Sequence, residues 1–73
     1  MQTYPSSVTI KTIVTYYGEV SGVTITVSKR SGGIGRDDYL VAGTNGFTAT
    51  CRTEDQAIEA ARRELARLER EAA

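Results

Sequence analysis

Alternating apolar and polar positions predict two β-strands in the first part of the chain. Within residues 8–17, the more apolar positions share one face: Val8, Ile10, Val14 and Tyr16. The opposite face takes Thr9, Lys11, Thr15 and Tyr17, and Ile13 interrupts the alternation. Residues 23–29 repeat the pattern with β-branched residues, which suit a half-buried strand. The segment 18–22, with glycine at both ends, predicts a turn that joins the two strands into a hairpin.

Asn45-Gly46 predicts a second hairpin, formed by residues 38–44 and 47–52. Asn-Gly is the preferred pair of a two-residue type I′ turn, because both central residues of that turn need a positive φ. A two-residue loop pairs Thr44 with Phe47, and it gives the sheet one apolar face: Leu40, Ala42, Phe47, Ala49 and Cys51. The opposite face then takes Tyr39, Val41, Thr48, Thr50 and Arg52.

Residues 54–71 have the period of an amphipathic helix. Thr53 and Gln56 have the spacing of a capping box, in which the hydroxyl accepts a hydrogen bond from the backbone three residues on. The apolar stripe that follows has three- and four-residue spacing: Ile58, Ala61, Leu65, Leu68 and Ala72. On the polar face, helical spacing predicts three ion pairs: Glu59–Arg63, Glu64–Arg67 and Arg67–Glu71.

Together these elements predict a single α+β domain over residues 1–73. It consists of a four-stranded antiparallel sheet, made of two hairpins, with one C-terminal helix packed on one face. The other face is open to solvent, and we expect it to hold Thr9, Thr15, Thr24, Thr26, Thr48, Thr50, Ile13, Tyr17, Tyr39 and Val41. The larger apolar and aromatic groups among them exceed what a solvated face needs, so this face is a candidate partner surface.

The chain carries nine basic and nine acidic side chains, so it is neutral at pH 7. This balance argues against strong nonspecific attraction to nucleic acid or to an anionic membrane. The sequence shows neither a signal-peptide pattern nor an apolar run of membrane-spanning length, and we expect no membrane partner. Because Cys51 is the only cysteine, it cannot form an internal disulfide, and a reducing cytoplasmic location follows as the expectation.

Residue types that carry catalysis or bind metals are scarce. The chain has no histidine, which excludes Ser–His and Cys–His nucleophile pairs, and one cysteine without histidine excludes an ordinary structural zinc site. The face assignment makes Cys51 an inward, structural residue. Asp37-Asp38 could ligate a cation, but adjacent acids in a loop are usually solvated. We therefore expect no enzyme, no cofactor and no metal site.

A glycine-rich segment between the hairpins is a second candidate site. Gly32, Gly33 and Gly35, with the basic residues Lys29, Arg30 and Arg36 around them, have the chemistry of a phosphate cradle. Phosphate-binding fingerprints, however, need a helix directly after the loop, and here a strand follows, which favours a plain connector. Ile34 has two interpretations: it either packs back onto the domain or contacts a partner.

The C-terminal segment GFTATCRTEDQAIEAARRELARLE leads from an aromatic strand into a helix. It resembles the small sheet-type DNA-binding domains of phage integrase arms and plant-type transcription factors, including their T-x-x-x-A helix start, here Thr53 to Ala57. Those domains insert a three-stranded sheet into the major groove and use Arg and Lys on the open strands. In this chain that face is mostly threonine, with Lys11 and Arg52. The resemblance implies a sheet-face DNA-binding domain as an alternative function.

In size, charge balance, sheet-plus-helix architecture and lack of catalytic residues, the chain also resembles the small phage-encoded inhibitors called anti-CRISPR proteins. This resemblance covers architecture and composition and no specific residues. Members typically bind a CRISPR effector or surveillance complex and block DNA recognition or nuclease recruitment. It implies a non-enzymatic protein-binding inhibitor, encoded by a phage or mobile element and acting in the cytoplasm of a bacterial host cell. A third hypothesis is a small dimeric structural module, so monomer and homodimer both stay open.

We place the predicted partner surface at the glycine-rich segment and the adjoining open face. Its residues are Lys29, Arg30, Ile34, Arg36, Asp37, Asp38, Tyr39 and Tyr17. Charges of both signs and one aliphatic side chain suit a concave site on a partner, and the two tyrosines offer rigid anchors. The rival surface is the charged helix face around Arg63 and Arg67.

Overall fold

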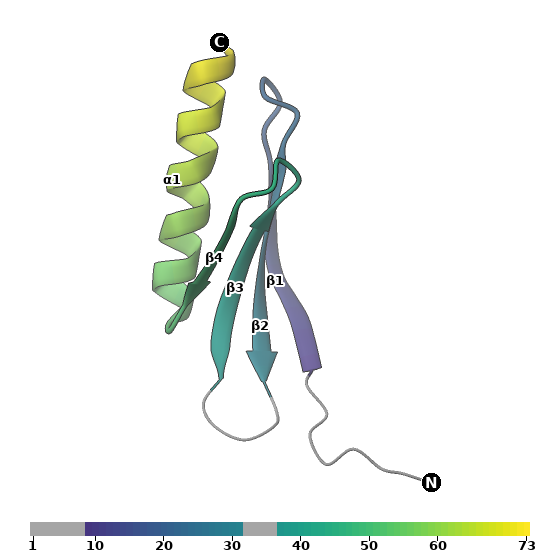
Figure 1. The fold of residues 1–73 in the computed structure, drawn as a ribbon, viewed down its shortest axis with the longest axis vertical. Coiled ribbons are helices and arrows are strands. Elements are labelled where there is room, and N and C mark those ends of the chain that lie inside the picture. Colours follow the sequence, from purple (N-terminus) through teal and green to yellow (C-terminus); the bar gives the residue numbers. More distant parts are fainter. Residues whose placement is uncertain (1–8, 32–36) are drawn as a thin grey trace, which may run out of the picture.

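The computed structural model describes residues 9–31 and 37–73. Its elements follow in the order β1 (Thr9–Tyr17), β2 (Thr24–Ser31), β3 (Asp38–Gly43), β4 (Thr48–Cys51) and α1 (Glu54–Ala72). The strands form one antiparallel sheet in the order β1-β2-β3-β4, and α1 packs against one face of it (Figure 1). The predicted α+β class, with two hairpins and one C-terminal helix, is confirmed.

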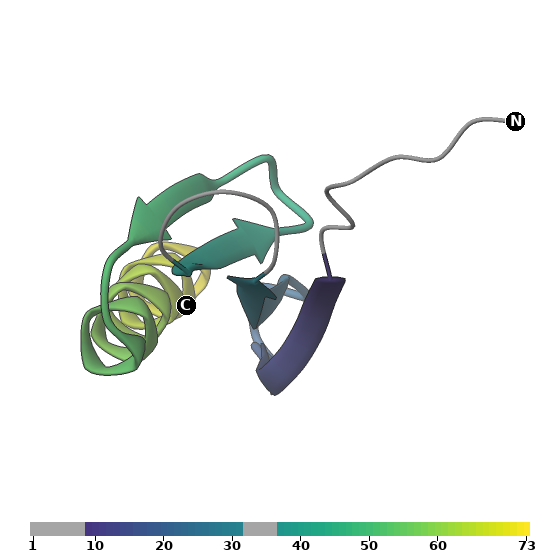
Figure 2. The same ribbon diagram turned by 90° about the horizontal axis from the view of Figure 1, so that it is seen from below.

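The core lies where α1 crosses the sheet. Ile25 and Val27 of β2 and Val41 of β3 meet Ala57 and Ala61 of α1, and each of these residues is at most 1 % exposed. Alanine has a small side chain, so the helix backbone comes close to the strands and leaves little empty volume. Figure 2 shows α1 beside β3 and β4, with β1 at the far side of the sheet. The opposite sheet face, which α1 does not cover, is called the open face below.

A β-bulge at Ile13 divides β1 into two halves. Thr12 pairs with Ser28 and Val14 pairs with Val27, so Ile13 is an extra residue with no partner of its own on β2. An extra residue reverses the alternation of side chains along a strand. The break in the apolar pattern at Ile13 is therefore a structural feature of the strand, and the two halves of β1 have opposite phase.

The bulge corrects the predicted faces of β1. After the bulge the prediction is correct, because Val14 packs against the core. Before the bulge it is wrong: Ile10 pairs with Arg30 on the open face and is 59 % exposed, whereas Lys11 lies on the α1 side. Ile13 was predicted on the open face, and it instead packs against the core.

The turn between β3 and β4 has three loop residues and not two. Gly46 N–H donates to the Gly43 carbonyl at 3.0 Å, and Gly43 N–H donates to the Phe47 carbonyl at 2.8 Å. Gly46 has φ +97°, while Asn45 keeps a negative φ. This pattern is that of a type I turn followed by a left-handed glycine. The Asn45 side chain stabilises it by accepting a hydrogen bond from Phe47 N–H at 3.2 Å.

The extra loop residue shifts the register of the second hairpin by one residue. Val41 pairs with Ala49 and Tyr39 with Cys51, so these side chains face α1. Leu40 and Ala42 consequently lie on the open face. The predicted assignment of Tyr39 and Val41 to the open face, and of Leu40 and Ala42 to the core, is therefore wrong. A one-residue slip moves every side chain of a strand to the other face.

The start of α1 is capped as predicted. The Thr53 hydroxyl accepts a hydrogen bond from Gln56 N–H at 3.1 Å. The Gln56 side chain reaches back and accepts from Arg52 N–H at 3.4 Å, one residue before the cap. Acidic residues occupy the first turn and a basic residue the last, in keeping with the helix dipole. No helix within the described ranges is long and apolar enough to span a membrane.

The buried face of α1 differs from the predicted stripe at its edges. Ala61 is central, as predicted, but the fully buried residue of the first turns is Ala57 and not Ile58, which is half-buried at the margin. Ala72 is exposed. The contact face also includes a charged residue, Glu64, which is only 8 % exposed. The close approach of helix and sheet leaves room for alanine at its centre and displaces the larger isoleucine sideways.

Glu64 is held by partners from two elements. Its carboxylate accepts hydrogen bonds from Arg67 Nε at 3.1 Å and Nη2 at 2.6 Å, and from Asn45 Nδ2 at 3.4 Å. The hydrogen bonds from Arg67 are the main reason that the pKa of Glu64 lies below its usual value. The two other predicted ion pairs are also present, Arg63–Glu59 at 2.8 Å and Arg67–Glu71 at 2.9 Å.

We expect Arg67→Met to destabilise the domain more than Arg63→Met. Loss of Arg67 leaves the buried Glu64 carboxylate without its main partner, whereas the Arg63–Glu59 pair is 76 % and 69 % exposed and contributes little. Thermal unfolding followed by circular dichroism should show a Tm about 5 °C lower for Arg67→Met and a change of less than about 2 °C for Arg63→Met. Equal changes in Tm would show that Glu64 does not need this partner.

Candidate partner-binding surface

A cluster of paired charges forms the end of the sheet where β2 ends and β3 begins. Arg30 and Asp38 are direct neighbours in the β2–β3 register. The guanidinium donates two hydrogen bonds to the carboxylate, from Nε at 2.9 Å and from Nη2 at 2.5 Å. Arg30 thereby holds the pKa of Asp38 below its ordinary value. Lys29 and Asp37 add a second, looser pair, with Nζ and Oδ2 3.6 Å apart.

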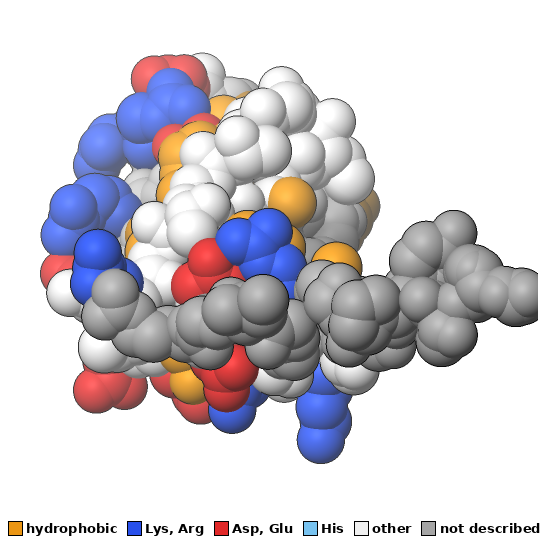
Figure 3. Space-filling view, turned by 60° about the horizontal axis from the view of Figure 1, so that its bottom comes forward, with side chains coloured by type: hydrophobic (Ala, Val, Ile, Leu, Met, Phe, Trp, Pro, Cys, Tyr) orange, Lys and Arg blue, Asp and Glu red, His pale blue; other side chains and the backbone are white. Residues whose placement is uncertain are grey.

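This cluster, defined as Lys29, Arg30, Asp37 and Asp38, carries both signs of charge and is neutral as a unit. The side chains of its two basic residues are 42 % and 43 % exposed, so their polar ends reach solvent. Figure 3 shows basic and acidic side chains close together at this end of the molecule. A shallow depression beside the cluster is lined by Asp37, Asp38, Thr50, Cys51 and Arg52.

The rest of the open face is mostly hydroxyl-bearing. The strand registers bring its residues into cross-strand rows. From the charged end upward the rows are Ile10, Arg30 and Asp38; Thr12, Ser28, Leu40 and Thr50; Thr15, Thr26, Ala42 and Thr48; and finally Tyr17 and Thr24. Figure 3 shows this face as a mostly white surface with isolated orange side chains. It offers a broad polar platform with a charged cluster at one end.

The structure brings together only part of the predicted partner surface. Lys29, Arg30, Asp37 and Asp38 are adjacent. Tyr39 is next to them in the chain, but its side chain packs against the core on the α1 side. Tyr17 is 61 % exposed at the opposite end of β1, about 20 Å from Arg30 at a strand rise of about 3.3 Å per residue. Two further predicted residues, Ile34 and Arg36, lie outside the described residues.

The rival surface on α1 has arginines that are already neutralised. Arg63 pairs with Glu59, and Arg67 pairs with both Glu64 and Glu71. A second shallow depression is lined by Asp55, Ile58, Glu59, Arg62 and Arg63. Its charges are mixed and its one apolar side chain is half-buried. The α1 surface is therefore a weaker candidate than the open face.

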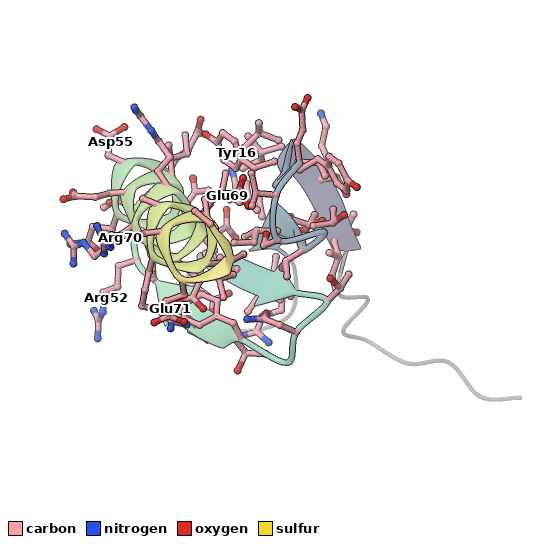
Figure 4. The ribbon with its side chains drawn as sticks, turned by 90° about the horizontal axis from the view of Figure 1, so that it is seen from above. Tyr16, Arg52, Asp55, Glu69, Arg70 and Glu71 are labelled. Atoms are coloured by element: carbon pink, nitrogen blue, oxygen red, sulfur yellow. The ribbon has the colours of Figure 1, made fainter. Side chains whose placement is uncertain are left out.

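Glu69 has a role that the sequence pattern did not predict. Its carboxylate accepts hydrogen bonds from the backbone N–H of Val20 at 3.0 Å and of Ser21 at 2.8 Å, both in the β1–β2 turn. Hydrogen bonds from Ser21 and Val20 lower the pKa of Glu69. Figure 4 shows Glu69 pointing from α1 toward this hairpin, near Tyr16, while Arg70 points away. One signal was present in the sequence: an acid near a helix C-terminus is unfavourable unless a tertiary partner compensates.

Within residues 9–31 and 37–73, no group of three or more His, Cys, Asp or Glu side chains could hold a metal ion. Cys51 is half-buried and packs against the core, as a structural residue would. No protein-family model, no curated protein and no solved structure matches the chain. Its function therefore has to be argued from its own surface.

Proposed function

We propose that this protein is a non-enzymatic protein-binding inhibitor and that its target is a nucleic-acid-processing complex of the CRISPR type. The observation that carries the proposal is the open face, an uncovered polar platform that ends in the Arg30–Asp38 ion pair, with the Lys29–Asp37 pair at the same end of the sheet. Paired charges that are half exposed can exchange partners with complementary groups on another protein. They also give the contact a fixed register, which supports specificity.

The pairing of these charges favours a protein partner over DNA. A sheet that enters the major groove needs unpaired basic groups on its open strands, because phosphate contacts supply most of the affinity. Here Arg30 is bound to Asp38 through two hydrogen bonds, and the bulge in β1 turns Lys11 away from the open face. Arg52 follows directly after β4, beside Asp38 and Thr50. Apart from Lys11, it is the one cation at this end of the sheet, among the described residues, without an ion-pair partner.

Exchange of the two charges within the cluster tests the site. The double variant Arg30→Asp with Asp38→Arg keeps an ion pair at the same register position, so the fold should persist. The pattern of charge that a partner meets is reversed, and we expect affinity for the target complex to fall by at least about 30-fold. The measurement is binding and inhibition of purified CRISPR effector complexes on their DNA substrate.

The α1 surface supplies the matched control. Glu59→Arg with Arg63→Glu exchanges an exposed pair in the same way and should leave inhibition unchanged. If this control abolishes inhibition and the cluster variant does not, the site is wrong while the function class stands. If the unmodified protein neither binds nor inhibits any effector complex, the proposed target is wrong.

The alternative function, a sheet-face DNA-binding domain, predicts a different result in a DNA-binding experiment. Its affinity for duplex DNA should be measurable at physiological salt and should fall steeply as salt rises, because each phosphate contact releases counterions. We expect no such binding. A steep salt dependence whose slope falls by about one in Arg52→Ala would favour the DNA-binding alternative.

A further inference from the structure

The outer edge of β1 is the longest unpaired edge of the sheet. In the part of the chain that the structure describes, β1 has nine residues and pairs with β2 alone, whereas the other edge strand, β4, has four residues. Of the three large hydrophobic residues that are exposed within the described ranges, two lie on this strand, Ile10 at 59 % and Tyr17 at 61 %. A long edge with exposed apolar groups is a template for another strand.

The hydrogen bonds show which residues of β1 direct their backbone outward. Thr44 N–H donates to the Thr24 carbonyl at 3.0 Å, so Thr24 directs its backbone groups toward β3. Tyr17 of β1 is opposite Thr24 of β2. Because the backbone groups of Thr24 point toward β3, Tyr17 and Thr24 form a non-hydrogen-bonded pair of the antiparallel ladder. Tyr17 therefore directs its N–H and carbonyl to the free edge, and by alternation so does Thr15.

Before the bulge, the residues of β1 that direct their backbone groups outward are the even-numbered ones. Thr12 is opposite Ser28, which has the same parity on β2 as Thr24. Thr12 and Ile10 therefore also direct their backbone groups outward. The outward residues of β1 are thus Ile10 and Thr12 before the bulge and Thr15 and Tyr17 after it. A regular partner strand could match one half of this edge but not both, because Thr12 and Thr15 are three positions apart in the chain, whereas outward residues of a regular strand are two positions apart.

We propose that two copies of this chain pair through β1, antiparallel, with Ile10 opposite Tyr17 and Thr12 opposite Thr15 of the other copy. The two-fold axis passes between Ile13 and Val14. The partner carries the same bulge at the same place, so every outward residue meets an outward residue along the full strand. This match singles out a second copy of the chain over an unrelated strand.

The side chains agree with this pairing. Ile10 and Tyr17 of the other copy share the open face, so each exposed apolar group covers the other. Lys11, the only charged residue of β1, lies opposite Tyr16, so no like charges face each other. α1 packs over β2, β3 and β4 and contacts β1 least, so the shared outer edge of β1 is not covered by either copy of α1 (Figure 2). The result is one continuous sheet with the helices on the same side.

Sedimentation equilibrium of the full chain tests the pairing. Between about 5 and 500 μM we expect a monomer–dimer equilibrium, because an interface of one strand pair is small. Tyr17→Lys should raise the dimer Kd at least about 10-fold, since it removes the cross-strand apolar contact. Val20→Lys is the matched control, because Val20 is equally exposed at 58 % but lies in the β1–β2 turn, and it should leave the Kd unchanged. A chain that stays monomeric over this range overturns the proposal.

Disulfide trapping tests the register. In a Cys51→Ser background, a mixture of the Thr12→Cys and Thr15→Cys variants should cross-link, because hydrogen-bonded antiparallel neighbours have Cα atoms about 5.5 Å apart, within disulfide range. Either variant alone should cross-link much less, since its own cysteines are then not opposite each other. A dimer that resists Tyr17→Lys, or that cross-links equally in the single variants, uses another surface and overturns the proposal. Neither test depends on the proposed inhibitory function.

Discussion

Replacement of Ala61 by aspartate is expected to remove most of the stability of this domain. Ala61 is fully buried between α1 and the sheet, in contact with the cluster formed by Ile25, Val27 and Val41. A carboxylate at this position would be taken out of water with no partner, at a cost of about 3–5 kcal/mol. A domain of this size has about 4–11 kcal/mol of stability in total. Urea unfolding followed by circular dichroism measures the loss.

Ala66→Asp is the matched control, because it makes the same chemical change at an exposed position of the same helix. The helix propensity of aspartate is then the same in both variants, and only the burial differs. We expect Ala66→Asp to cost less than about 1 kcal/mol. If the two variants have similar urea midpoints, α1 does not present the Ala57 and Ala61 face to the sheet.

Features with a local cause could be predicted from the sequence. The cap at Thr53 depends only on residues within one helical turn, and the three ion pairs of α1 depend only on helical spacing, so both were correct. The alternation of Ile25 and Val27 with polar residues also predicted a buried face correctly. These local features were sufficient for the fold class, because four strands and one capped helix have few ways to bury their apolar faces.

The sequence predicts a feature less well where it is compatible with two similar local structures, as at the turn between β3 and β4. Asn45-Gly46 is compatible with a two-residue turn, but a single residue at positive φ, Gly46, is enough for the three-residue turn. The longer turn also lets Asn45 bond both Phe47 N–H and the Glu64 carboxylate on α1. That second contact is tertiary, so the sequence pattern of the hairpin could not show it.

The wrong turn length between β3 and β4 and the bulge at Ile13 both changed the predicted open face. The shifted register took Tyr39 out of the open face, and the bulge at Ile13 took Lys11 out of it. The predicted proximity of Arg30 and Asp38 is correct, because the two residues are direct neighbours across β2 and β3. Tyr17 was assigned to the same surface from its face alone, although strand length places it at the other end of the sheet.

Glu69 and Gly18 form a contact that ties α1 to the β1–β2 hairpin. Gly18 is buried, and a Cβ added to it would lie 2.5 Å from Glu69 Oε2 and 2.9 Å from Leu65 Cδ1. The carboxylate can therefore bind Val20 N–H and Ser21 N–H only because position 18 has no side chain. Gly18→Ala is expected to displace Glu69 from the turn and to cost about 1–3 kcal/mol.

A double-mutant cycle between Gly18 and Glu69 should therefore be non-additive. A Cβ at position 18 would also lie 2.5 Å from Ser21 Oγ, and this contact and the one with Leu65 remain in a Glu69→Ala background. In that background Gly18→Ala should therefore lose the part of its effect on the urea midpoint that comes from the carboxylate. The pKa of Glu69 is lowered in the folded state, so its stabilising contribution is present above its ordinary value of 4.5 and is lost as pH falls through the lower, folded value. The coupling should accordingly be full near neutral pH and should fade in acid. If Gly18→Ala costs the same in both backgrounds at pH 7, the added methyl group acts through Ser21 and Leu65 alone, and the missing side chain at position 18 is not what admits the Glu69 carboxylate.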